Sequence, residues 1–218
     1  MTALLQRLAP VARTIAWPAL TGGALACVAV VVAAPHLPAA FPLARWPGLG
    51  ALTLCVGAAF LLDDDAATTV DATPTSLAQR RLLRVALALP LLGAVWAAAL
   101  WYATSAPQAW FGPDARVALS LQLGAMLALT LAASALALRA LPGEHCGWTG
   151  AVAPFALLSA MLALPERWTL LAMPGDAAWA AVQQRWTALL VLGLITFAWA
   201  GREPWPQRPS RNRPQVTG

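Results

Sequence analysis

The chain has 218 residues, of which 60% are apolar and only 11% are charged, and all 14 of its basic side chains are arginine. Soluble domains carry about 25% charged residues and disordered chains are poor in apolar ones, so the composition excludes both and predicts an integral membrane protein. Without lysine, the chain cannot contain a Walker A phosphate loop, a Schiff-base lysine or a kinase-type catalytic lysine.

The first segment, residues 1–13, predicts a short helix that lies on the membrane surface. Leu4, Leu5 and Leu8 share one helical face, whereas polar residues stand elsewhere. Short amphipathic helices of this kind lie in the plane of the membrane interface.

Six apolar stretches follow, and each approaches the ~20 residues that a helix needs to cross the bilayer. They cover residues 14–37, 46–62, 85–104, 117–138, 150–165 and 186–200. The first could instead be a cleaved signal peptide, but its apolar run exceeds the about 7–15 residues typical of one. The sequence therefore predicts an all-α polytopic membrane protein, with a six-helix transmembrane domain over residues 14–200.

The arginines predict the orientation of these spans, because short cytoplasmic loops carry the excess of positive charge. With the N-terminus inside, ten arginines fall on the cytoplasmic side and four on the outer side, namely Arg45, Arg116, Arg167 and Arg185. Tryptophans near the span ends fit the interfacial level. We therefore expect a multi-pass protein of the inner (plasma) membrane with both termini in the cytoplasm.

Three aspartates open the loop between the second and third spans. Asp63, Asp64 and Asp65 follow an apolar span, where acidic groups oppose the helix dipole. They fit better as the start of a new short cytoplasmic helix, with Asp65 as its N-cap. Pro74 then ends that helix.

The same loop returns to the membrane through a basic segment. Ser76 and Gln79 have the spacing of a capping box, which predicts that the next helix begins in the cytoplasm and runs through Arg80, Arg81 and Arg84. Residues 63–84 are then either a docking element for a cytoplasmic partner or a solvated loop with ordinary positive-inside arginines.

On the outer side, residues 166–185 separate the fifth and sixth spans. Pro174, Gly175 and Asp176 predict a turn, and Asp176 could cap a following helix. We expect two short helices that form a hairpin dipping into the outer leaflet. The alternative, which is equally compatible with the sequence, is an ordinary loop with the sixth span starting earlier.

Chemical sites are sparse in this sequence. No predicted span carries Asp, Glu or Arg at its centre, which disfavours an ion-coupled transporter, and we expect no metal site and no catalytic residues. Ser120, Gln122 and Thr130 are polar residues of the fourth span. They are candidates for lining a transport pathway, although hydrogen bonds between helices are the commoner role of such residues. Residues 201–218 predict a disordered basic tail.

The order of these features resembles the permease subunit of ABC exporters, in the class with six spans and a separate ATPase chain. The features are a surface helix, two spans, a short cytoplasmic helix at 63–74, a Thr-Pro-Thr-Ser-Leu-Ala-Gln-Arg-Arg re-entry at 73–81 and an outer hairpin at 166–185. The segment FLLDDDAATTVDATPTSLAQRRLLR is similar to small actinobacterial members of this class. Two departures are the short loops and the three aspartates, which replace a glutamate-rich lead into the coupling helix.

The resemblance implies a coupling helix that a groove on the ATPase receives. Contacts with the ATPase would come from Asp63, Asp64, Asp65, Val70, Asp71 and Thr73. The membrane re-entry would be fixed by Ser76, Gln79, Arg80, Arg81 and Arg84.

The resemblance also implies that this chain binds no cofactor, because ATP and Mg belong to the partner ATPase. The permease would work as a homodimer or heterodimer, in contact with membrane lipid and not with nucleic acid. It would move a hydrophobic or amphipathic substrate. The alternative is a non-transporting membrane scaffold or accessory subunit of a membrane complex.

Overall fold

The computed structural model of the chain describes residues 12–37, 47–63, 77–105, 115–140, 147–172 and 175–202. Across these ranges every regular element is helical, which confirms the all-α prediction there. The elements are α2 (Trp17–Ala33), η1 (Ala34–His36), α3 (Pro47–Ala59), η3 (Phe60–Leu62), α4 (Leu77–Ser105), α5 (Ala115–Ala140), α6 (Gly147–Ala163), η4 (Glu166–Trp168) and α7 (Trp179–Ala200). Most of the predicted surface helix and nearly all of the predicted tail lie outside the described residues.

Four of these helical segments are long and apolar enough to cross a membrane: Trp17–His36, Gln79–Ser105, Ala115–Ala140 and Trp179–Ala200. Two further apolar segments, Pro47–Leu62 and Gly147–Ala163, are shorter. At 1.5 Å per residue α5 is about 39 Å long, whereas α6 is about 25 Å long and falls short of the ~30 Å hydrocarbon core. The six apolar helices coincide in position with the six predicted spans, and the four long ones fit a membrane protein.

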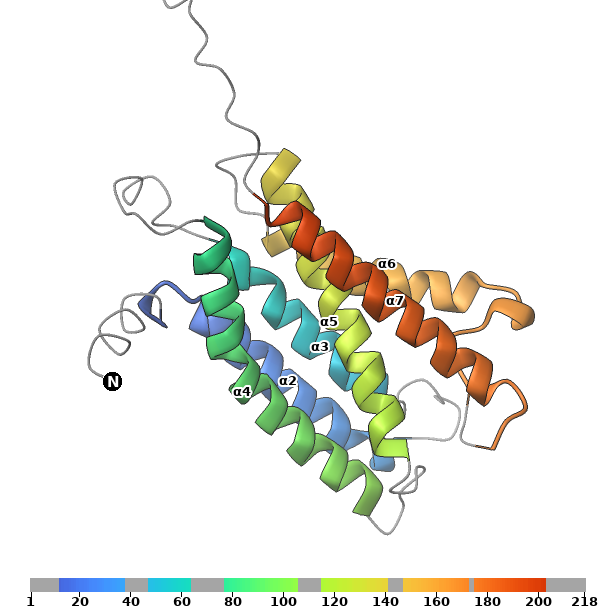
Figure 1. The fold of residues 1–218 in the computed structure, drawn as a ribbon. Coiled ribbons are helices and arrows are strands. Elements are labelled where there is room, and N and C mark those ends of the chain that lie inside the picture. The colour runs from blue at the N-terminus through green and yellow to red at the C-terminus, as the bar shows by residue number, and fades with distance from the viewer. Residues whose placement is uncertain are drawn as a thin grey trace, which may run out of the picture.

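The bundle is built around α3 and α5. Figure 1 shows α4 at one side of the bundle and α7 at the other, with α3 and α5 between them. Helix α3 packs against α2, α5 and α6, and ten of its thirteen residues are buried. Its sequence, PGLGALTLCVGAA, consists mainly of small residues, and small residues let neighbouring helices approach closely in lipid.

Glycine permits the closest contact between α2 and α3. A Cβ atom added at Gly23 would lie 2.7 Å from the carbonyl oxygen of Thr53 and 2.9 Å from the Cα of Gly57. Between α5 and α7, a Cβ at Gly193 would lie 2.9 Å from the Cβ of Ala128. Any larger side chain at these positions must push two backbones apart.

Successive helices run in opposite directions. Arg84 near the start of α4 contacts Thr14, which precedes α2. Asp63 after η3 contacts Gly147 at the start of α6, and Arg139 near the end of α5 contacts Trp199 near the end of α7. The starts of α2, α4 and α6 therefore meet the ends of η3, α5 and α7 at one end of the bundle.

The segment 166–185 differs from the two short helices that we expected. The structure has one 3-10 turn, η4, and then a long α7 that begins at Trp179. The N-cap residue is Ala178, with no side-chain cap, while the carbonyl of Asp176 accepts a hydrogen bond from the N–H of Trp179. The alanine-rich sequence after the turn contains no helix breaker, so α7 forms without interruption and starts before residue 186, as the second alternative has it.

Candidate functional site

A buried arginine links three helices at the end of the bundle where α4 begins. Arg84 is only 3% exposed. Its Nε donates a hydrogen bond to Thr14 Oγ1 at 3.1 Å, and its Nη1 donates one to the carbonyl oxygen of Asp63 at 2.8 Å. A buried guanidinium needs hydrogen-bond acceptors to offset its desolvation, and these two oxygens supply them.

The carboxylate of Asp63 connects the same region to α6. Its Oδ1 accepts a hydrogen bond from the backbone N–H of Gly147, the first residue of α6, at 2.8 Å. A carboxylate at a helix N-terminus satisfies an unpaired N–H and interacts favourably with the helix dipole. A Cβ at position 147 would clash with the ring of Phe60 and lie 2.6 Å from Asp63 Oδ2, so glycine lets this contact form.

We call Thr14, Asp63, Arg84 and Gly147 the Asp63–Arg84 cluster. Its hydrogen bonds join the end of η3 to Thr14 ahead of α2, to α4 and to α6. Asp63 directly precedes residues 64–76, which connect η3 to α4. The remaining residues predicted to dock a partner or to begin the re-entry lie outside the described part of the chain: Asp64, Asp65, Val70, Asp71, Thr73 and Ser76.

The four predicted re-entry residues that the structure describes differ in their exposure to solvent. Helix α4 spans Leu77–Ser105, and Leu77 is the first described residue after residue 63. On its first turns Gln79 is exposed, and Arg80 and Arg81 are half-buried. Arg84 alone among the four is buried. The structure brings Asp63, predicted to contact the ATPase, together with Arg84, predicted to fix the re-entry, because Arg84 donates to the backbone carbonyl of Asp63.

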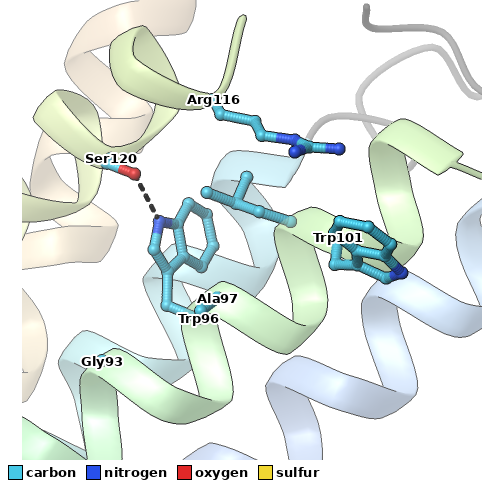
Figure 2. A pocket seen from close by; sticks show the side chains of 7 residues that line it. Gly93, Trp96, Ala97, Trp101, Arg116 and Ser120 are labelled. Carbon is cyan, nitrogen blue, oxygen red and sulfur yellow. Dashed lines mark hydrogen bonds between the residues drawn. The ribbon is translucent and has the colours of Figure 1, made fainter. Parts of the chain in front are cut away.

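A groove opens between α4 and α5 at the opposite end of the bundle. It has a volume of about 380 Å³ and is lined by apolar, aromatic and polar residues: Gly93, Trp96, Ala97, Leu100, Trp101, Arg116 and Ser120. Figure 2 shows the Trp96 indole N–H directed at Ser120 Oγ, and Arg116 lying at the upper edge of the view. The Trp96–Ser120 distance is 3.3 Å, and Arg116 Nε donates to Thr104 Oγ1 at 2.9 Å.

The three residues predicted as pathway candidates do not share one face of α5. Ser120 is exposed and lines the groove, whereas Gln122 and Thr130 are buried. Thr130 Oγ1 donates to the Met126 carbonyl of its own helix. Gln122 Oε1 has no hydrogen-bond partner among the described residues. Hydrogen bonds between helices are made by Ser120, which accepts from α4, and by Ser134 Oγ, which donates to the Ala59 carbonyl of α3.

Sequence reasoning missed the side chains that secure the segment after α6. Arg185 donates hydrogen bonds to the carbonyls of Thr169 and Arg167 at 2.6 and 2.8 Å. The fully buried Trp186 donates from its indole to the carbonyl of Leu170 at 3.1 Å. Arg-Trp dipeptides occur at 45–46, 167–168 and 185–186, and the last of them was the available signal. Its two side chains supply the donors to these backbone carbonyls.

Arginine and tryptophan also pair near both ends of the bundle. The guanidinium carbons of Arg116, Arg139 and Arg185 lie 5.1, 4.4 and 5.8 Å from the ring centres of Trp101, Trp199 and Trp168, respectively. On α5, Arg116 and Arg139 are about 35 Å apart at 1.5 Å per residue. This separation slightly exceeds the ~30 Å thickness of the hydrocarbon core. Each Arg–Trp pair would therefore lie at a membrane interface, where such side chains are preferred.

No family model, curated protein or solved structure matches this chain. Over the part of the chain that the structure describes, no group of three or more His, Cys, Asp or Glu side chains is placed to hold a metal ion.

Proposed function

We propose that the chain is the membrane-spanning permease subunit of an ATP-driven exporter of the ABC type. It crosses the inner membrane six times, has both termini in the cytoplasm, and works as a dimer with a separate ATPase. ATP and Mg are bound by that ATPase. The cargo is hydrophobic or amphipathic, because the spans offer no charged residue at their centres.

Two features support six crossings although α3 and α6 are short. Helix α3 is enclosed by α2, α5 and α6, so it contacts protein over most of its surface and does not have to match the lipid thickness. The chain after α6 continues through residues 164–172, where Arg185 and Trp186 satisfy backbone carbonyls. Irregular backbone at membrane depth is tolerated when protein shields it.

The observation that supports the proposal most is the Asp63–Arg84 cluster, which includes the residue directly before segment 64–76. A coupling segment must pass a movement of the ATPase to the transmembrane helices. Here the first residue of the loop is hydrogen-bonded to α4 and to α6, and through Arg84 to Thr14 ahead of α2. A displacement of the segment would therefore reach three helices directly, because buried and satisfied polar networks are rigid.

The cluster also decides which aspartates should be changed to test the proposal. Asp63 binds α6 inside the molecule, so changing it would alter stability and docking together. Charge reversal of Asp64 and Asp65 to lysine leaves the four residues of the cluster themselves unchanged. The matched control reverses Asp114 and Asp176, two aspartates on the predicted outer side, which gives the same change of net charge.

We expect the full-length chain, purified in mild detergent from its own cells, to bring an ATPase with it. The Asp64→Lys, Asp65→Lys protein should insert normally into the membrane and lose the ATPase, whereas the control should keep it. Equal retention of the ATPase by both proteins would exclude docking through this segment. If a different permease is recovered in place of an ATPase, the chain is an accessory subunit.

A further inference from the structure

The groove between α4 and α5 is amphipathic along its length. At one end lie Arg116, the second residue of α5, and Trp101, which is 65% exposed. At the other end lies Gly93, where an added Cβ would meet no atom within 4 Å. Gly93 and Trp101 are about 12 Å apart along α4 at 1.5 Å per residue. The groove thus runs from the positively charged Arg116 towards the middle of the bundle, and the residues between are mainly apolar.

Arg116 carries a positive charge that the described residues leave uncompensated. Its Nε donates to Thr104 Oγ1, and this is the one hydrogen bond that it makes within the described residues. Its guanidinium lies 5.1 Å from the ring centre of Trp101, an attraction that neutralises no charge. Within the described part of the chain its terminal nitrogens bind nothing, and arginine is well suited to bidentate binding of phosphate.

The depth of Arg116 matches that of a lipid phosphate. Arg116 with Trp101, and Arg139 with Trp199, stand about 35 Å apart along α5 and bracket the hydrocarbon core. Below Arg116 the small side chain of Ala97 and the missing side chain of Gly93 leave room beside the Trp96 ring (Figure 2). A soluble anion would bind Arg116 but would leave this apolar part of the groove unoccupied.

We propose that this groove binds one anionic phospholipid in the leaflet opposite the Asp63–Arg84 cluster. The phosphate group lies at Arg116, and the first part of one acyl chain lies along Trp96, Ala97 and Gly93. The site is separate from the proposed docking segment and does not depend on an ATPase partner. It goes beyond general contact with lipid because it selects the headgroup by charge.

Native mass spectrometry of the delipidated full-length protein tests this site. Phosphatidylglycerol and phosphatidylcholine with identical acyl chains are offered in equal amounts. We expect the wild-type protein to prefer phosphatidylglycerol. We expect Arg116→Gln to bind it about tenfold more weakly, because the variant loses a hydrogen bond to a charged group, and tenfold corresponds to about 1.4 kcal/mol. An unchanged preference in Arg116→Gln would overturn the proposal.

A second variant tests the acyl-chain part of the groove without touching the charge. Gly93→Leu places a side chain in open space, so the fold is kept while the deep end is filled. Its matched control is Gly22→Leu on α2, where a Cβ also meets nothing within 4 Å. We expect Gly93→Leu to lose phosphatidylglycerol and Gly22→Leu to retain it.

Two results would contradict a phospholipid site at this position. Equal binding by Gly93→Leu and Gly22→Leu would mean that the lipid does not occupy the groove. Displacement of phosphatidylglycerol by inorganic phosphate at similar concentration would mean that a free anion, and not a lipid, is the occupant.

Discussion

Arg84 is the last of three arginines in the first turns of α4, and the structure buries it. Charged residues inside a membrane helix are costly, and they persist where they are paired or serve a function. Arg84 meets this requirement with the Asp63 carbonyl and the Thr14 hydroxyl, both at the end of the bundle. Its neighbours Arg80 and Arg81 reach more solvent. Three arginines that look alike in sequence therefore have different physical roles.

Replacement of Arg84 by glutamine should destabilise the fold. The variant leaves the Asp63 carbonyl without its donor, and a hydrogen bond to a charged group is worth about 1.5–3 kcal/mol. We expect a lower midpoint in an SDS unfolding titration followed by circular dichroism. Arg202→Gln, at an exposed position after α7, is the matched control and should leave the midpoint unchanged. An equal midpoint for both variants would show that Arg84 does not hold this end of the bundle.

At the scale of the helices, packing depends on where small residues stand. Gly22 and Gly23 are neighbours on α2, yet a Cβ meets nothing within 4 Å at Gly22 and meets the backbone of α3 at Gly23. Membrane helices gain stability from close backbone approach, since lipid provides no hydrophobic force between them. Adjacent glycines of the same helix thus differ in whether they belong to the interface.

This difference predicts opposite outcomes for two single-methyl changes. Gly23→Ala should separate α2 from α3 and cost about 1–3 kcal/mol, the usual range for overpacking. Gly22→Ala should be neutral or slightly stabilising, because alanine has the higher helix propensity. Thermal unfolding of both variants in the same detergent measures the difference. A similar loss of stability in the two proteins would contradict the close α2–α3 contact.

For the whole molecule, the number of crossings depends on the two short helices. Length and composition identify four helices that can cross a membrane, and α3 and α6 are shorter. The polypeptide reverses direction at each connection in the bundle, and the contacts of Arg84, Asp63 and Arg139 bring alternate ends together. This alternation is the geometry that six crossings require.

Cysteine labelling tests whether the short helix α3 crosses the membrane. In a chain without its native cysteines, single cysteines are placed at the exposed positions His36 and Gln79. With six crossings, a membrane-impermeant maleimide should label His36→Cys from outside and Gln79→Cys only after permeabilisation. Labelling of both positions from outside would mean that α3 does not cross, because only α3 separates them.

Much of the helix content could be predicted from the sequence. A long apolar run has to form hydrogen bonds within itself in lipid, so the helices of the described residues coincide with the predicted spans. The capping box predicted between Ser76 and Gln79 stays a prediction, because Ser76 lies outside the described residues. The segment 166–185 was predicted less well, because the pairing of Arg185 with distant carbonyls is invisible to local periodicity.

Composition and hydrophobic pattern by themselves determined that this is a helical protein of membrane type without a P-loop, because both depend on residue type and local order alone. Only the tertiary structure decided that Asp63 caps α6, that Arg84 is buried beside it, and that Arg116 faces a groove. Each of these depends on residues far apart in the chain meeting across helices. The sign of a charge can be read from the sequence, whereas its burial and its partner are set by how the helices pack.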